Sequence, residues 1–143
     1  MRPIDTIIME VQSETPLIKT LRLDRSLDPH PGQYAMVWIR GLAEVPMSFS
    51  GPDTITVQSV GEASEALNSL GEGRSIGLRG PLGKGFTLLG ERILIIGGGV
   101  GTAPLAFLGE QAMNAGMEVT SLIGYRCCSG VLFLTSSQRQ GST

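Results

Sequence analysis

The sequence predicts a small antiparallel β-barrel followed by an incomplete α/β domain. Short apolar runs separated by glycine and proline extend from Ile4 to about Leu89, a pattern typical of small barrels and sandwiches. After Gly90, the apolar run Arg92 to Ile96 leads through glycines into a helical stretch and a second strand, the β–α–β order of a parallel sheet. We therefore expect two domains, residues 1–90 and 91–143, with the boundary near Leu89 to Glu91.

Alternating polarity marks the strands of the first domain. Leu21 to Asp24 alternates apolar and charged residues, as in a half-buried strand. The run from Tyr34 to Ile39 has few polar positions, so we expect both of its faces to be covered. Val45 to Ser50 is typical of a short edge strand, and further short strands are predicted around Ile55 and Ile76.

One helix interrupts this β pattern. Ala63, Ala66, Leu67 and Leu70 recur at helical spacing, and Gly71 follows as a stop signal. The first turn, with Ser64 as a hydroxyl donor, offers an anion site. A helix that merely closes the barrel would show the same pattern, and composition does not separate the two interpretations.

The strongest single signal lies at the start of the second domain. The strand Ile93 to Ile96 runs through Gly97 to Gly101 into a helix from about Thr102 to Ala115. Such a turn directs free N–H groups and the positive helix end outward, which suits a pyrophosphate. The alternative is a tight strand–helix turn without a ligand. The third glycine of the dinucleotide fingerprint is replaced here, and no acidic residue is well placed after the second strand.

The second domain is short for a doubly wound fold. The strand Arg92 to Ile96 is continuously apolar, as expected of a strand buried on both faces. Beyond it only the strand 118–123 is predicted, and the polar tail from Thr135 is expected to fray. We expect this domain to be truncated or completed by another chain, because two strands leave an exposed sheet edge.

Composition excludes several classes of function. The net charge of −2, from 11 basic and 13 acidic residues, gives no field that would attract nucleic acid or an anionic membrane. No apolar stretch approaches the roughly 20 residues of a membrane helix. The 2 cysteines, Cys127 and Cys128, are adjacent and indicate a reducing, cytoplasmic location rather than a disulfide framework. The single histidine, His30, lies in a loop, so we predict neither a catalytic grouping nor a metal site.

Taken in order, several segments resemble the ferredoxin–NADP reductase superfamily and, within it, the electron-transfer subunits of dihydroorotate dehydrogenases. The resemblance extends to about Leu134. The segments that carry it are Pro31 to Tyr34, Val45 to Ser48, Gly61 to Ser64, Gly80 to Phe86 and Gly97 to Pro104. It implies that the barrel is an FAD-binding domain of the ferredoxin reductase type and that an incomplete α/β domain for a nicotinamide nucleotide, NAD(H), follows it.

The resemblance also implies a role for each segment. The flavin would contact Pro46, Met47 and Ser48 on one strand and Thr56, Val57 and Gln58 on the next. The FAD pyrophosphate would lie at Gly61, Ala63 and Ser64, and the second nucleotide at Gly98, Gly99, Gly101, Thr102 and Pro104. Val45 stands where the superfamily usually has an arginine, and Met47 where it has an aromatic residue. Cys127 and Cys128 do not match the ligands of the family's 2Fe–2S cluster, so this chain's cysteines do not support that cluster.

The resemblance implies a function in pyrimidine biosynthesis, with electrons passing between NAD and a larger flavin-containing subunit, the dihydroorotate dehydrogenase catalytic subunit. Two alternatives stay open at this point. One is the small reductase subunit of a ferredoxin:NADP oxidoreductase or a hydrogenase. The other is a truncated, non-catalytic remnant of the FAD domain.

Overall fold

The computed structural model describes residues 2–98, 101–127 and 130–139, with side chains described as far as Gly124. The chain divides into two compact units, Met1–Gly85 and Phe86–Thr143, each of which is considered by itself. The sequence prediction had placed the boundary slightly later, near Leu89 to Glu91.

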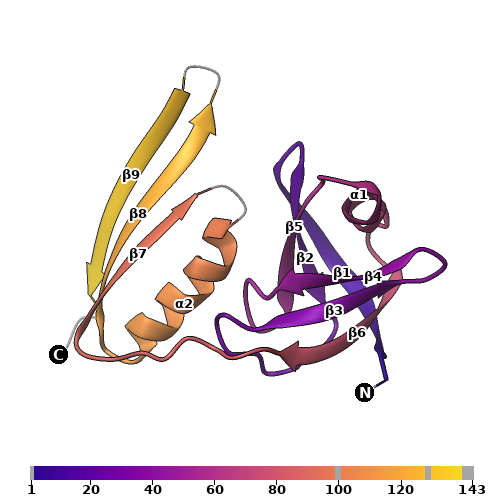
Figure 1. Cartoon of the computed structure of the whole chain (residues 1–143), viewed down its shortest axis with the longest axis horizontal. Helices are drawn as coiled ribbons and strands as arrows, with labels where there is room; N and C mark the ends of the chain where they lie inside the picture. Colours follow the sequence, from indigo (N-terminus) through magenta and orange to yellow (C-terminus); the bar gives the residue numbers. More distant parts are fainter. Residues whose placement is uncertain (1, 99–100, 128–129, 140–143) are drawn as a thin grey trace. The chain divides into compact units, whose positions relative to one another are not determined.

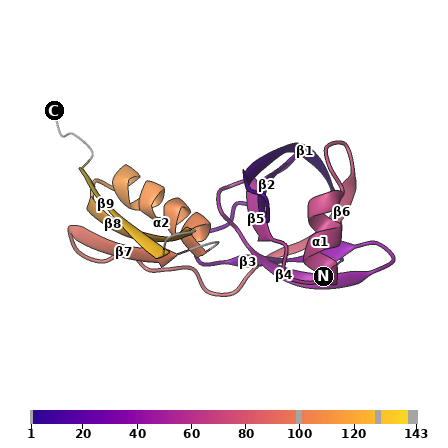
Figure 2. The same ribbon diagram turned by 90° about the horizontal axis from the view of Figure 1, so that it is seen from above.

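The first unit is a six-stranded antiparallel sheet in the order β4-β3-β6-β1-β2-β5 (Figure 1). Figure 2 shows that this sheet is curled, with β1 and β2 opposite β3 and β4. The predicted antiparallel barrel is thus confirmed as a half-barrel whose two edge strands are β4 and β5. Its elements are β1 (Ile4–Thr15), β2 (Ile18–Leu23), β3 (Tyr34–Ile39), β4 (Ala43–Ser48), β5 (Thr54–Gln58), α1 (Glu62–Ser69) and β6 (Ser75–Leu82).

The core of this unit lies on the inner face of the curled sheet. Its largest fully buried side chains include Phe49, Ile8, Leu21, Ile55 and Leu67. Leu67 comes from α1, so the helix does close the barrel core. Burial of these side chains supplies the main favourable free energy, at about 1.5–3 kcal/mol for each large one.

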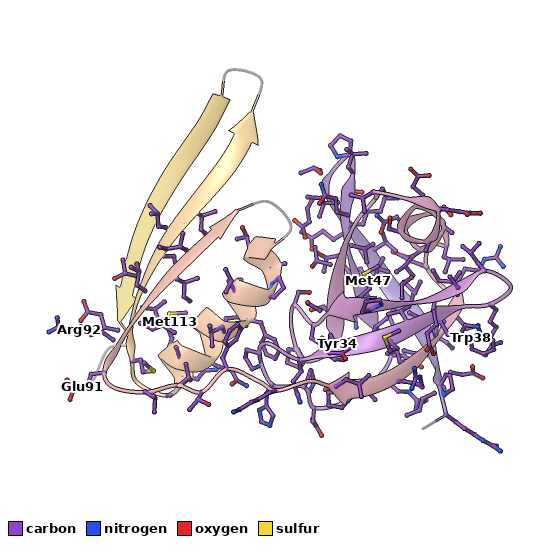
Figure 3. All side chains as sticks on the ribbon, in the orientation of Figure 1. Tyr34, Trp38, Met47, Glu91, Arg92 and Met113 are labelled. Carbon is purple, nitrogen blue, oxygen red and sulfur yellow. The ribbon has the colours of Figure 1, made fainter. Side chains whose placement is uncertain are left out.

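The prediction that both faces of Tyr34–Ile39 are covered is wrong. Ala35, Val37 and Ile39 are buried, but Tyr34 is 36% and Trp38 38% exposed. The reason is architectural, because a half-barrel has only one interior. Large apolar side chains on β3 therefore lie on its outer face, and Figure 3 shows Tyr34 and Trp38 there, on the other side of the β3–β4 pair from Met47.

The second unit is a three-stranded sheet in the order β7-β8-β9 with one described helix. Strands β7 and β8 are parallel, as predicted, and α2 connects them. Ile95, Leu108, Ala112, Met117 and Val119 form the buried cluster between helix and sheet. The elements are β7 (Arg92–Gly98), α2 (Thr102–Asn114), β8 (Glu118–Cys127) and β9 (Gly130–Arg139).

Two expectations for this unit are wrong. The tail was expected to fray from Thr135, yet β9 pairs antiparallel with β8 along its length, from Cys127↔Gly130 to Glu118↔Arg139. Main-chain pairing at the free edge of β8 needs no apolar side chains. The strand Arg92 to Ile96 was expected to be buried on both faces, yet Leu94 and Ile96 are each 63% exposed. Within the described residues, α2 covers only the face that contains Ile95.

Candidate functional site

The edges of the half-barrel meet at the turn between β4 and β5. Phe49 and Ile55 form an antiparallel bridge, and the Ser50 N–H donates to the Thr54 carbonyl at 3.0 Å. From this turn the two strands diverge (Figure 1). The predicted flavin-contacting residues, Pro46 to Ser48 and Thr56 to Gln58, therefore lie on the two strands that border the opening of the sheet.

The hydrogen-bond alternation of β5 fixes which main-chain groups face outward. The Leu23 N–H donates to Asp53 O and the Ser59 N–H to Leu17 O, both at 2.8 Å. In an antiparallel ladder such bonds recur at every second residue. Thr56 and Gln58 therefore direct their N–H and C=O groups away from β2, toward the open edge.

The same alternation applies to β4. The Phe49 N–H donates to Gln33 O at 3.2 Å, so residues of the same parity, including Met47, bond to β3. Pro46 and Ser48 face the open edge instead. Pro46 has no N–H to donate, but the ladder loses no bond, because residue 46 faces away from β3. The Phe49–Ile55 bridge pairs the Thr56 N–H with the Ser48 carbonyl, so the groups that stay available to a ligand on β4 are the Ser48 N–H and the Pro46 carbonyl.

We call these outward main-chain groups of Pro46, Ser48, Thr56 and Gln58 the open edges. Apart from the bond between the Thr56 N–H and the Ser48 carbonyl, these groups are donors and acceptors on edge strands that no neighbouring strand pairs with. The side chain of Thr56 is engaged elsewhere, since its hydroxyl bonds to Thr20 and Ser50, each at 2.9 Å.

Helix α1 begins directly after β5 and presents the second part of the site. Its first internal bond runs from the Glu65 N–H to Gly61 O at 2.9 Å. The N–H groups of Glu62, Ala63 and Ser64 precede it and have no partner within the helix. These donors and the positive end of the helix dipole suit a phosphate.

Ser64 is arranged differently from the prediction. Its hydroxyl accepts hydrogen bonds from the N–H groups of Val60 at 2.8 Å and Gly61 at 3.1 Å, and it donates to Gly61 O at 3.1 Å. The side chain is therefore a cap that shapes the loop, rather than a free donor. The acidic residues Glu62 and Glu65 in the first turn stabilise the helix start and place negative charge beside it.

The far end of α1 is fastened to β5 and β2. Asn68, only 5% exposed, donates to Val57 O at 3.1 Å and to Ser59 Oγ at 2.8 Å. The Lys19 ammonium donates to the main-chain carbonyl of Asn68 at 3.0 Å. Lys19 lies opposite Val57 in the sheet, so the contacts of Asn68 converge on one point of the β2–β5 pair.

A shallow hollow lies along β3 and β4, lined by Gly32, Tyr34, Met36, Pro46, Met47 and Ser48. Tyr34, Met36, Pro46 and Ser48 belong to the outer face of these strands. On the same face Glu44 and Arg79 form a two-point ion pair, with Nε–Oε2 at 3.0 Å. The hydrogen bond from Arg79 lowers the pKa of the Glu44 carboxyl below its ordinary value of 4.5. The Glu44 carboxylate in turn raises the pKa of Arg79.

The glycine turn of the second unit lies between β7 and α2. Gly97 packs closely against α2, because a Cβ there would lie 2.9 Å from Leu105 Cδ1 and the end of that side chain would have to shift. Gly98 and Gly101 are exposed, and Pro104 occupies the first turn of α2, where its missing N–H leaves no bond unmade. Gly99, also predicted to contact the nucleotide, lies outside the described residues.

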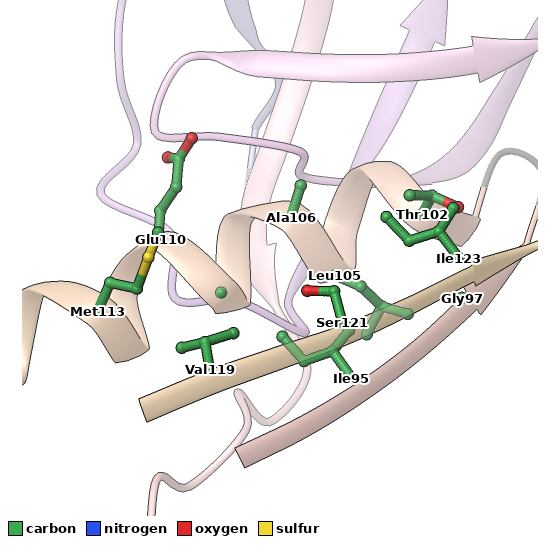
Figure 4. Close-up of a pocket in the computed structure, with 11 residues that line it drawn as sticks. Ile95, Gly97, Thr102, Leu105, Ala106, Glu110, Met113, Val119, Ser121 and Ile123 are labelled. Atoms are coloured by element: carbon green, nitrogen blue, oxygen red, sulfur yellow. The ribbon is translucent and has the colours of Figure 1, made fainter. Parts of the chain in front are cut away.

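A cavity of about 210 Å³ lies between α2 and the sheet of the second unit (Figure 4). Gly97 and Thr102 line one end, and Glu110 and Met113 the other. The Thr102 hydroxyl is buried and has no hydrogen-bond partner among the described residues. The volume is below the roughly 300–1,000 Å³ of ordinary ligand pockets, so a dinucleotide does not fit within this cavity.

The residues predicted for FAD lie on three consecutive elements of the first unit, namely β4, β5 and the start of α1. Sequence reasoning missed Asn68, Ser59 and Lys19, which fix the position of α1. A polar residue on the buried face of a short helix was the available signal for Asn68, since it stands next to the apolar Leu67.

Among the described residues, no three or more His, Cys, Asp or Glu side chains cluster in a way that could hold a metal ion. Within the same residues, no helix has the length and apolarity needed to span a membrane.

Curated relatives match most of the chain. A probable dihydroorotate dehydrogenase B (NAD(+)) electron transfer subunit from Methanocella arvoryzae is 56% identical over 135 residues, or 93% of this chain and 52% of the relative. A protein of the same name from Methanocaldococcus jannaschii is 38% identical, with the same coverage of 93% and 52%. The chain thus spans about half the length of these relatives. No protein-family model matches it.

Solved structures confirm the fold. The FAD/NAD-binding domain of nitric oxide dioxygenase from Vibrio cholerae superposes with a TM-score of 0.78 at 22% identity, covering 91% of this chain and 65% of that one. An NADH-dependent reduced ferredoxin-NADP oxidoreductase gives a TM-score of 0.77 at 23% identity, covering 85% and 48%. The architecture is therefore that of ferredoxin reductase-type FAD/NAD-binding proteins, with a small and incomplete second unit.

Proposed function

Since this chain is a homologue of the electron-transfer subunits of dihydroorotate dehydrogenase B, matching about half of their length, we propose that it binds FAD and takes part in electron transfer between NAD and a dihydroorotate-oxidising subunit. The observation that carries the proposal is the continuity of the open edges with the start of α1. Hydrogen-bonding groups for a flavin ring and donors for a pyrophosphate follow one another along residues 46–64.

The residues present fit the cofactor. The open edges of β4 and β5, at Pro46, Ser48, Thr56 and Gln58, offer main-chain donors and acceptors to the ring. Met47 and Val57 belong to the same strands but bond inward to the neighbouring strands, so their part is to hold the edges in place. The N–H groups of Glu62, Ala63 and Ser64 would hold the pyrophosphate, with Gly61 in extended conformation before them.

FAD, when bound, supplies both hydride and single-electron chemistry, which no side chain of this unit provides. The protein's part is to bind and orient it. Because Val45 replaces the superfamily's usual arginine, the pyrophosphate would depend on helix N–H groups, and Glu62 and Glu65 oppose it electrostatically.

The second nucleotide, NAD(H), is assigned to the turn before α2. Gly98, Gly101 and the first turn of α2 with Thr102 and Pro104 support this assignment, since a parallel β7–α2–β8 unit presents a helix start at the carboxyl end of a strand. Gly99 is part of the same assignment.

The partner we propose is a larger flavin-containing subunit, the dihydroorotate dehydrogenase catalytic subunit. The family's 2Fe–2S cluster is not assigned to this chain, because Cys127 and Cys128 alone cannot supply its ligands. A cytoplasmic location, without nucleic acid or membrane as a partner, completes the proposal.

The experiment that tests FAD binding is an ultraviolet–visible spectrum of the purified chain, before and after loading with FAD and removal of the excess. Retained flavin bands are the expected result. A folded chain that stays colourless after loading would overturn the proposal.

A non-catalytic FAD-domain remnant is the second candidate. The observation in its favour is the second unit, where one described helix covers one face and Leu94 and Ile96 are exposed. Steady-state reduction of a dye by NADH separates the two. Turnover by the FAD-loaded chain removes the second candidate, whereas bound flavin without turnover favours it.

A further inference from the structure

The amide of Asn68 joins the two parts of the candidate FAD site. It lies in the last turn of α1, away from the helix start, and is 5% exposed. Both of its N–H groups are used, one on Val57 O at 3.1 Å and one on Ser59 Oγ at 2.8 Å. Val57 belongs to the strand that carries the open edge, and Ser59 to the loop that leads into α1.

The loop between β5 and α1 is fixed from both sides. The Ser59 N–H donates to Leu17 O at 2.8 Å, while its hydroxyl accepts from Asn68. The next N–H groups, of Val60 and Gly61, are both taken by Ser64 Oγ. The donors that are left for a phosphate are therefore those of residues 62–64, and their position depends on how α1 is held against β5.

Asn68 also carries an energetic cost. Its Oδ1 is buried and has no hydrogen-bond partner among the described residues. An unsatisfied buried acceptor costs about 1–3 kcal/mol, which offsets much of what the two donated hydrogen bonds contribute to stability. An amide at this position is better explained by the geometry it imposes than by stability.

We propose that Asn68 is a positioning residue for FAD: it locks α1 to β5 so that the helix-start donors and the open edge of β5 stand at a fixed spacing. Lys19 supports this lock by binding the main-chain carbonyl of Asn68 from β2. The inference rests on the proposed FAD binding and adds a residue that would not itself contact the cofactor.

The test compares FAD affinity with the stability of the cofactor-free chain. Asn68→Leu keeps the branched shape of the side chain, although leucine is larger than asparagine, and it removes both hydrogen bonds and the unpartnered oxygen. We expect its FAD dissociation constant, measured by flavin fluorescence, to rise about tenfold. The thermal midpoint of the apoprotein should fall only slightly, because removal of the unpartnered oxygen offsets much of the loss of the two hydrogen bonds. Unchanged affinity would overturn the inference, and so would a loss of affinity that is fully accounted for by unfolding of the apoprotein at the titration temperature.

Two further variants complete the test. Ser69→Ala is the matched control, because it removes the neighbouring hydrogen bond to Ala66 O, which stays within α1, and should leave FAD affinity unchanged. Ser59→Ala removes one of the two acceptors of Asn68 and should weaken FAD about threefold. If Asn68→Leu does not fold, Ser59→Ala decides: unchanged affinity overturns the inference. A folded wild-type chain that binds no FAD counts against the proposed function itself, and is seen before any variant is made.

Discussion

Glu44 on β4 and Arg79 on β6 form a two-point ion pair across the intervening strand β3. The side chain of Glu44 is 30% exposed and that of Arg79 is 29% exposed. The pair joins the edge strand β4 to the interior of the sheet, so it bears on how firmly the edge that carries Pro46 to Ser48 is held.

The pair predicts a pH dependence of stability. Because Arg79 lowers the pKa of Glu44 in the folded state, this carboxylate stabilises the fold above its ordinary value of 4.5, and the contribution is lost as the pH falls through the lower folded value. Urea unfolding of wild type and Glu44→Gln should show the variant less stable at pH 7, with the difference shrinking below about pH 4.5. A difference that stays constant from pH 7 to about pH 3 would contradict this reasoning.

The hydroxyl of Ser64 predicts a linked loss of helix stability and FAD affinity. Ser64→Ala removes the cap on Val60 and Gly61 and should cost about 1 kcal/mol in the free energy of unfolding. It should also weaken FAD binding, because the loop before the phosphate donors is released. Ser64→Thr retains the hydroxyl and is the control. Equal FAD affinity in all three proteins would show that the cap does not shape the site.

Thr56 should act through its main chain and not through its side chain. Thr56→Val keeps the shape but leaves the hydroxyls of Thr20 and Ser50 without one partner each, which should lower the unfolding free energy by about 1 kcal/mol. FAD affinity should stay within about twofold of wild type, since the N–H and C=O groups at the open edge are unchanged. Isothermal titration measures this, and a large loss of affinity would assign the hydroxyl to the ligand.

The sequence was sufficient to predict the strands and helices, but it did not predict which of their faces are buried. Gly and Pro punctuation located the strands, and the helical spacing of Ala63, Ala66 and Leu67 located α1 closely. Burial could not be predicted in the same way, because an apolar run such as Tyr34 to Ile39 has the same composition whether one or two layers pack against it. The answer depends on the sheet order, which no local pattern contains.

The site shows the same limit. Motif order placed Pro46 to Ser48, Thr56 to Gln58 and Gly61 to Ser64 in the predicted site. However, whether a main-chain group faces the neighbouring strand or the open edge depends on which residues of the ladder are hydrogen-bonded. The role of Ser64 likewise depends on the partners of its hydroxyl. Asn68 was missed because its partners, Val57 and Ser59, precede it by 11 and 9 residues and meet it only once α1 folds back on β5.

The two faces of β7 predict opposite responses to charge. Leu94 is 63% exposed, so Leu94→Lys should leave the thermal midpoint of the chain nearly unchanged. Ile95 is 6% exposed within the cluster beneath α2, and Ile95→Lys should destroy the packing of the second unit. Similar destabilisation by both substitutions would mean that the face of Leu94 is covered in solution.

Gly97 and Gly98 predict different responses to one added methyl group. A Cβ on Gly97 would lie 2.9 Å from Leu105 Cδ1 and 3.4 Å from Thr102 Cα, whereas one on Gly98 would meet only Gly124 O at 3.6 Å. Gly97→Ala must therefore shift the end of the Leu105 side chain, at a cost of about 1 kcal/mol. Gly98→Ala should be tolerated by the fold.

If the turn binds a nicotinamide nucleotide, Gly98→Ala should still weaken that binding, because it covers exposed backbone at the start of the glycine turn. Urea unfolding and NADH titration of both variants measure the two effects separately. Equal stability of the two variants would show that close packing of α2 does not require a glycine at residue 97.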